Sequence, residues 1–128
     1  MAGCPTYLSH VLLNQVFRNV AYTPPTTVYA ALYTSDPGPD DIGQEVSGNG
    51  YARVPVSFSE PKNRAIENSD KVEFPEATGS WGTITHLGIK DAQTGGNLLA
   101  YGAIENPKAV EAGDQVIFRE GDIIISLE

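Results

Sequence analysis

The residues whose side chains could take part in catalysis or binding are concentrated between positions 78 and 104, in the segment TGSWGTITHLGIKDAQTGGNLLAYGAI. His86 is the first candidate, because an imidazole titrates near neutral pH and can act as a general base. A serine hydrolase would also need a nucleophile on a sharp strand-to-helix turn and an acid that orients the histidine. The chain contains no G-x-S-x-G motif, and EVSGNG at 45–50 is too rich in turn formers to build that elbow. We therefore predict no catalytic residue and no enzymatic activity.

The side chains that could bind metal are scattered along the sequence. His10 and His86 fall on different predicted elements with no cysteine or acidic pair beside either, so we expect no zinc site. Cys4 is the single cysteine and cannot form an internal disulfide, which predicts a bystander thiol. Four acidic residues of one loop could hold calcium, but their spacing is not that of an EF-hand and a solvated loop is favoured. They are Asp36, Asp40, Asp41 and Glu45. A pair of carboxylates placed for glycoside cleavage stays open, because the sequence does not show spatial separation.

The glycines and aromatic residues of the segment 78–104 have structural explanations. A phosphate-binding loop needs glycines that open a helix, whereas these glycines stand in strand-like runs, so we expect no nucleotide and no other cofactor. Trp81 could stack on a sugar ring, and Tyr51 and Tyr101 could extend such a platform in a glycan-binding module. We favour a structural anchor role for Trp81, with its indole N–H bonded to a carbonyl, and a similar anchor role for Phe74.

Charge and length restrict the classes of partner. The chain has 128 residues and a net charge of −8, from eight basic and sixteen acidic residues. This balance argues against nucleic acid as a partner, since such binding rests on lysines and arginines that neutralise phosphates. No run of about eighteen apolar residues is present to span a membrane, and the first ten residues lack the pattern of a secretory signal. We expect a protein made in the cytosol that binds neither nucleic acid nor membrane.

One stretch near the N-terminus has helical periodicity. In residues 6–19, apolar side chains follow the spacing of three and four that gives a helix one apolar face. They are Tyr7, Leu8, Val11, Leu12, Leu13, Val16 and Phe17. Thr6 is predicted to cap the start, and Arg18 and Asn19 suit the end. A helix this short is not stable alone in water, so we expect it to pack on the domain or on a neighbouring subunit.

Most of the remaining chain is strand-like. Residues 27–35 predict a buried strand, 36–50 a long surface loop, and 51–61 an edge strand or a bulged one because Pro55 cannot donate to a ladder. Residues 71–74 predict another strand, and the segment 78–104 a hairpin connected by 92–96. In that hairpin Thr83, Thr85, Leu87 and Ile89 are expected on one face, and Ile84, His86, Gly88 and Lys90 on the other. The tail 114–128 divides at 119–122 into two strands.

These elements predict a mainly β protein. About seven short strands with one N-terminal helix indicate a single-domain antiparallel β-sandwich over residues 1–128, of jelly-roll or immunoglobulin-like type. The sequence shows neither internal repeats nor a linker that would separate a second domain.

The order of the elements also resembles a family of small bacteriophage virion proteins commonly labelled phage tail fibre proteins. The similarity covers nearly the whole chain, and its most specific parts are the glycine-aromatic segments SGNGYAR and SWGTITHLGI. It implies a structural component of the virion with no catalytic residues. The chain lacks the heptads, repeats or long shaft of an elongated fibre, which favours a compact attachment module.

The resemblance, together with the helix and loop, leads to a functional hypothesis. We expect a non-enzymatic virion protein, assembled in multiple copies in the bacterial host cytoplasm, that contacts other virion proteins and copies of itself. The tail is the favoured position, as a fibre, baseplate or attachment component. A capsid decoration protein is the first alternative and a host-glycan-binding module the second. The predicted intersubunit contacts are Tyr7, Leu8, Val11, Leu12, Val16, Phe17, Asp40 and Asp41.

Overall fold

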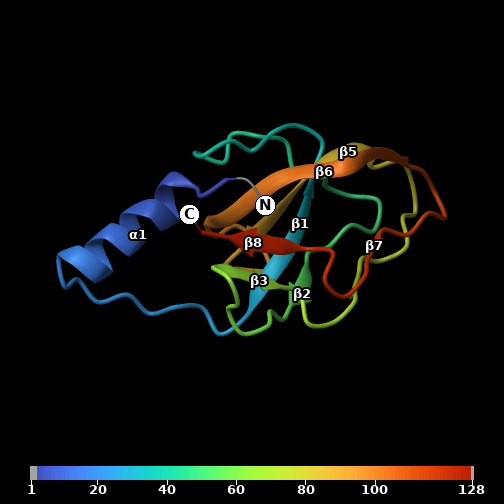
Figure 1. Ribbon diagram of the computed structural model, residues 1–128. Helices are drawn as coiled ribbons and strands as arrows, with labels where there is room; N and C mark the ends of the chain where they lie inside the picture. The colour runs from blue at the N-terminus through green and yellow to red at the C-terminus, as the bar shows by residue number, and fades with distance from the viewer. Residues whose placement is uncertain (1–2, 128) are drawn as a thin grey trace.

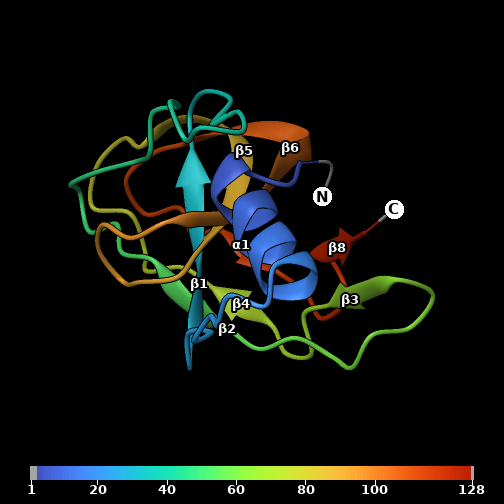
Figure 2. The same ribbon diagram turned by 90° about the vertical axis from the view of Figure 1, so that its left-hand side faces the viewer.

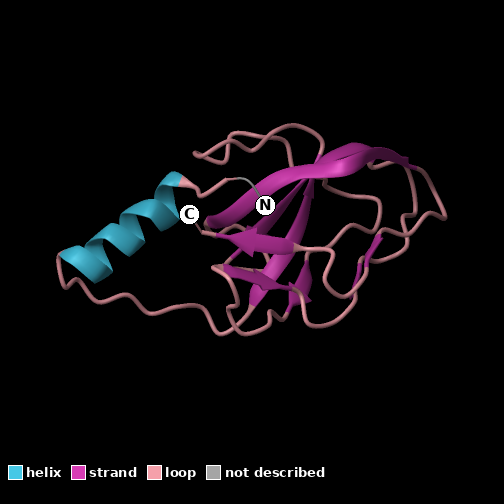
Figure 3. Cartoon of the chain, viewed as in Figure 1, coloured by secondary structure: helices cyan, strands magenta, loops and turns pink. Residues whose placement is uncertain are grey.

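The computed structural model describes residues 3–127, which form one helix and eight strands (Figure 1). The elements in chain order are α1 (Thr6–Phe17), β1 (Val28–Tyr33), β2 (Val54–Val56), β3 (Ala65–Glu67), β4 (Val72–Glu73), β5 (Gly82–Lys90), β6 (Leu98–Val110), β7 (Ile117–Phe118) and β8 (Ile124–Ser126). The predicted mainly β, antiparallel fold with one N-terminal helix is confirmed, with eight strands where about seven were expected (Figure 3).

A four-stranded antiparallel sheet in the order β2-β1-β5-β6 forms the larger layer. Strand β1 is rich in β-branched and aromatic residues and lies between β2 and β5. Pro55 lies in β2, at the edge of the sheet, where a residue without an N–H is tolerated. Strands β5 and β6 form the predicted hairpin, and Asp91 closes its connection by accepting the backbone N–H of Asn97 at 2.7 Å.

The second layer consists of two separate antiparallel pairs, β3 with β8 and β4 with β7. The two strands predicted in the tail are present but do not pair with each other. Each instead pairs with a strand that lies about 45 to 60 residues earlier in the chain. Neither pair is therefore a local hairpin. The sandwich is therefore asymmetric, with one continuous sheet facing two short ribbons.

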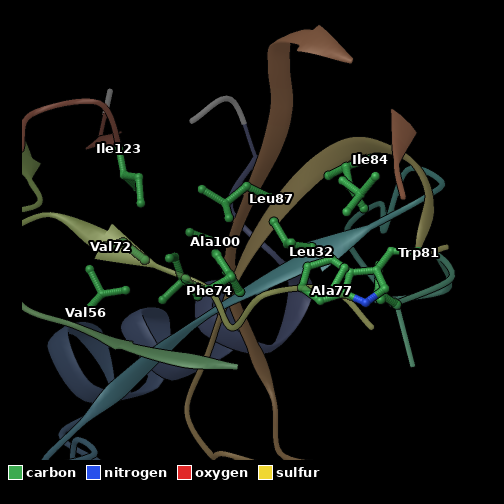
Figure 4. Packing of buried hydrophobic residues seen from close by; sticks show 14 residues of the cluster. Leu32, Val56, Val72, Phe74, Ala77, Trp81, Ile84, Leu87, Ala100 and Ile123 are labelled. Atoms are coloured by element: carbon green, nitrogen blue, oxygen red, sulfur yellow. The ribbon is translucent and has the colours of Figure 1, made fainter. Parts of the chain in front are cut away.

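The hydrophobic core lies between these layers (Figure 4). Leu32 of β1, Val72 of β4 and Ile123, which precedes β8, are each at most 2% exposed and come from both layers. Phe74 is fully buried and lies parallel to the ring of Tyr51, with 6.3 Å between the ring centroids. Aromatic packing of this kind joins the chain after β4 to the segment that precedes β2.

One register prediction was wrong. Ile84 was expected on the face opposite to Leu87 and Ile89, but all three residues belong to the same buried cluster. The pairing of β5 with β6 is irregular here, because Ile84 pairs with Lys108 and His86 with Ala103, so the regular alternation of β5 breaks around Thr85. Simple period-two counting from the sequence misses an irregularity of this kind, because it depends on the partner strand.

Helix α1 stands outside both layers (Figures 1 and 2). No residue of the helix is buried. The predicted cap by Thr6 was wrong, because no side chain caps the helix and the Thr6 backbone N–H instead donates to the Pro39 carbonyl at 2.9 Å. The helix also ends at Phe17, two residues earlier than predicted. Asn19 adopts a left-handed φ of 55°, and the Asn14 carbonyl accepts the N–H groups of Arg18 and Val20.

Candidate functional site

A polar network lies beneath the long loop that follows β1. Glu45 accepts two hydrogen bonds from the guanidinium of Arg53, at 2.8 and 2.7 Å, and a third from the Tyr51 hydroxyl at 2.6 Å. Burial disfavours the charged carboxylate, but these hydrogen bonds outweigh that cost and hold the pKa of Glu45 below its usual value. Burial, together with the bond to Glu45, raises the pKa of Tyr51 far above its ordinary value. The network is thus an ion pair of Arg53 and Glu45 to which the neutral hydroxyl group of Tyr51 is hydrogen-bonded.

Arg53 connects this loop to the β5–β6 connection. Its Nη1 donates to the carbonyls of Ala92 and Gly95, at 2.8 and 2.7 Å. The side-chain amide of Gln93 donates in return to the Arg53 carbonyl at 3.1 Å. The guanidinium, which is 8% exposed, therefore has four short bonds that tie two loops together.

Asp41 makes a second link between the loop and the sheet. It accepts hydrogen bonds from the Tyr33 hydroxyl at 2.8 Å and from the Lys90 ammonium at 2.5 Å. Lys90 is 5% exposed in this pair, and a charge so far from water needs such a partner. Of the two predicted contact residues in the loop, Asp41 is thus engaged within its own chain, while Asp40 is exposed. Among residues 3–127, no group of three or more His, Cys, Asp and Glu side chains is placed to bind a metal ion.

His86 lies near two groups that sequence reasoning did not connect with it. Its Nδ1 is 2.8 Å from the Thr85 hydroxyl oxygen, and its Nε2 is 3.8 Å from a carboxylate oxygen of Asp36. The distance to Asp36 exceeds a hydrogen bond and that carboxylate is 66% exposed, so it does not hold the ring in one orientation. The arrangement lacks the tight acid–histidine bond of a catalytic triad.

The aromatic residues considered for glycan stacking lie mainly inside the protein. Trp81 is 5% exposed and donates its indole N–H to the Asn49 carbonyl at 2.9 Å. Tyr51 packs edge-on against it, with 5.5 Å between the ring centroids. Tyr101 is half-buried, and its ring lies so close to Gly3 that a Cβ there would clash with it. A sugar needs a free ring face, and Trp81 and Tyr51 do not present one.

The helix carries the predicted contact residues in two groups. Tyr7, Leu8 and Val11 are half-buried. Leu12, Val16 and Phe17 are exposed, with Phe17 reaching 78%. The structure shows two further exposed apolar residues that were not among the predicted contacts, Leu13 and Val20, which are 54% and 43% exposed.

With Leu13, the exposed apolar residues at the end of α1 form a stripe that we call the helix stripe: Leu13, Val16 and Phe17. Their spacing of three and four residues places them on one side of the helix. That spacing is present in the sequence, and Val20 lies outside the stripe, beyond the end of the helix and after the left-handed Asn19. The stripe is a continuous apolar surface on an element that is otherwise separate from the core.

A groove of about 780 Å³ opens between β6 and the strands β7 and β8. Its floor includes Ile84 and Leu87, and its walls include Ile104, Ile117 and Phe118. Ile117 is 45% exposed. Sequence patterns did not predict this groove, because it arises where the continuous sheet meets two ribbons whose strands come from distant parts of the chain.

The fold and these surfaces define a small β protein whose polar networks serve its own architecture and whose apolar helix face is exposed. The family model for Podophage GP4 fiber I protein gp80 matches residues 3–126. The chain therefore belongs to this family of phage fibre proteins, which confirms the resemblance to phage tail fibre proteins. No curated protein matches the sequence. Within residues 3–127, α1 is too short to cross a membrane.

Proposed function

We propose that this protein is a non-enzymatic structural component of the phage tail, present in several copies per particle. The observation that carries the proposal is the family match, which spans 124 of the 128 residues and identifies a phage fibre protein. The particle assembles in the bacterial host cytoplasm from this protein and other virion proteins.

The distribution of polar contacts supports a structural role. Among the described residues, every buried side-chain nitrogen or oxygen has a hydrogen-bond partner. Buried polar groups that are left unpaired or carry strongly shifted pKa values in a cleft are typical of active sites. Here the shifted groups Glu45, Tyr51 and Arg53 bond to one another and to backbone carbonyls, which is what a rigid framework requires.

The exposed part of the helix supports contacts with other subunits. A contiguous exposed apolar surface on a protein of this size marks an interaction site. We propose that the helix residues provide these contacts: Tyr7, Leu8, Val11, Leu12, Val16 and Phe17. From the loop, Asp40 is the accessible candidate, and Asp41 would contribute by holding the loop in shape.

Copy number and position in the purified particle test the proposal. Quantitative mass spectrometry of intact virions and of isolated tails should give the same small number of copies per particle, and antibody labelling should mark the tail. Hundreds of copies on the head would instead identify a capsid decoration protein. Retention on host glycans by the wild type, lost in Trp81→Phe without a change in melting temperature, would favour the glycan-binding module.

A further inference from the structure

Lys90 and Asp41 form an ion pair between β5 and the loop that follows β1. We propose that this pair condenses after folding into an isopeptide bond, an amide that joins the two side chains. The inference goes beyond the proposed function, because it concerns the chain itself and holds wherever the protein lies in the particle. The bond links two residues that are 49 positions apart in the sequence.

The folded chain holds the reacting atoms in contact. The Nζ of Lys90 lies 2.5 Å from Oδ2 of Asp41, which is shorter than the usual hydrogen bond between nitrogen and oxygen. Because Oδ2 is bonded to Cγ, the nitrogen is within about 4 Å of the carbon that it attacks, near the separation from which intramolecular reactions proceed.

The backbone on both sides of the contact is held in place. Lys90 ends β5, where its backbone pairs with β1 on one side and with β6 on the other. Asp41 adopts a left-handed φ of 55° in a turn that is closed by the Ile42 N–H, which donates to the Pro37 carbonyl at 2.7 Å. The amine and the carboxyl group therefore meet in one fixed geometry.

Tyr33 polarises the carboxyl group from its other oxygen. Its hydroxyl donates to Oδ1 of Asp41 at 2.8 Å. Burial, together with this bond, raises the pKa of Tyr33 far above its ordinary value, so the hydroxyl keeps its proton and remains a donor. When Nζ adds to Cγ, negative charge develops on Oδ1. A donor that already points at this oxygen stabilises that charge in the way an oxyanion hole does.

The ion pair contains every atom that the reaction needs. A proton passes from the Lys90 ammonium to Oδ2 of Asp41, which gives a neutral amine and a carboxylic acid. The nitrogen lone pair then forms the bond to Cγ, and a second proton passes from the nitrogen to Oδ2. The bond between Cγ and Oδ2 breaks, and the oxygen leaves with the electron pair as water. One cation and one anion thus become one neutral amide and one water, with no co-reactant.

Burial favours the amide over the ion pair. The Lys90 side chain is 5% exposed, so its charge has lost most of its contact with water. A buried ion pair recovers this desolvation cost only in part, whereas an amide carries no net charge. Well-oriented groups also react as though they were present at about 10⁵–10⁸ M, which offsets the cost of condensation in water. Asp41 is 27% exposed, so the water that forms has a path out.

Two other ion pairs lack one of these features. Arg53 is as buried as Lys90, but its guanidinium stays protonated and does not supply a free amine to attack Glu45. Lys71 and Glu73 lie at the surface with side chains 58% and 44% exposed, so water solvates both charges. Among residues 3–127, the pair between β5 and the loop is thus the ion pair that joins a buried amine to a carboxyl group.

Intact-mass spectrometry of the denatured full-length protein tests the bond. The wild type should have a mass about 18 Da below that of its sequence, because one water is lost. A digest should contain a branched peptide that joins Asp41 to Lys90. Lys90→Arg should have the full mass of its sequence, since arginine keeps the charge but does not form the amide. Lys71→Arg is the matched control and should keep the loss.

Two results of these measurements would overturn the inference. The first is a wild type that has the full mass of its sequence, both when freshly purified and after prolonged warming. The second is a loss of water that maps to a cyclic imide within a single peptide, because that reaction does not involve Lys90.

Tyr33→Phe tests the role of the hydroxyl while keeping the buried ring. Loss of one donor to a developing oxyanion slows a reaction about a hundredfold or more, so little bonded chain should be present after a short pulse of synthesis. Formation at the wild-type rate would refute the role of Tyr33. Circular dichroism checks that the variant folds, and if it does not, the masses of the wild type and Lys90→Arg still decide. Copy number decides the tail position separately, so absence of the bond leaves the proposed function standing.

Discussion

Asn68 is the polar residue on which we expect the second layer to depend most. It is fully buried between β3 and β4. Its side-chain amide donates to the carbonyls of Asp70 and Arg119, both at 2.9 Å, and its side-chain oxygen accepts the Ile123 N–H at 2.8 Å. One side chain thus joins the turn before β4 to the connection between β7 and β8.

Asn68→Ala removes all three bonds and leaves two carbonyls and one N–H without these partners. The Ile123 N–H is buried, and leaving such a group unsatisfied costs about 1–3 kcal/mol, whereas the two partly buried bonds to Asp70 and Arg119 are worth about 0.5–1.5 kcal/mol each. We therefore expect a loss of about 2–6 kcal/mol in the free energy of unfolding. Domains of this size have about 5–15 kcal/mol in total. The variant should therefore lose a substantial part of its stability, through weaker attachment of both ribbons.

Urea unfolding followed by the fluorescence of Trp81 and by circular dichroism measures this loss. Asn106→Ala is the matched control, because Asn106 is exposed on β6 and its removal should change stability by less than about 0.5 kcal/mol. If Asn68→Ala lost less than about 1 kcal/mol with an unchanged denaturant slope, water or relaxation would satisfy the three groups. Our account of the second layer would then be refuted.

Two further predictions concern the loop network and the sheet. The lowered pKa of Glu45 means that its carboxylate stabilises the fold above its unfolded pKa of 4.5 and that this stabilisation is lost as the pH falls through the lower folded pKa. Glu45→Gln should therefore be less stable than the wild type at pH 7, and the difference in urea midpoint should shrink below about pH 4.5. A difference that stays constant to pH 3 would contradict this. Gly88→Ala should cost about 1–3 kcal/mol by thermal or urea unfolding, because a Cβ would lie 2.8 Å from the ring of Tyr33 and 3.0 Å from Leu98. Unchanged stability would show that the ring can move aside.

The sequence predicted the elements that depend on local patterns. The hairpin of β5 and β6 follows from two strand-like runs around a glycine-containing connection, and the edge position of β2 follows from Pro55. The pairing of β7 and β8 with β4 and β3 could not be predicted in the same way. It depends on contacts between distant segments, and the periodicity of a short strand does not specify its partner.

The polar network shows a similar limit. Asp41 and Glu45 were recognised only as acidic residues of a loop, and their spacing favoured a solvated surface. Their partners Lys90 and Arg53 lie 49 and 8 residues away, so only the folded chain brings opposite charges together. The apolar face of the helix was predicted from its spacing, but the sequence did not show that the face would remain exposed.

The bonds of Arg53 have a consequence for how the protein resists proteases. The loop 36–50 contains no strand and would ordinarily be an early cleavage site. Glu45 within it, however, is hydrogen-bonded to the Arg53 guanidinium, which also donates to the β5–β6 connection. Local opening there would break several short bonds at once, so this part of the loop should be cut late. The segment 18–27 has no such clamp and follows an exposed helix. Limited digestion should therefore begin there and separate the helix from a resistant β core.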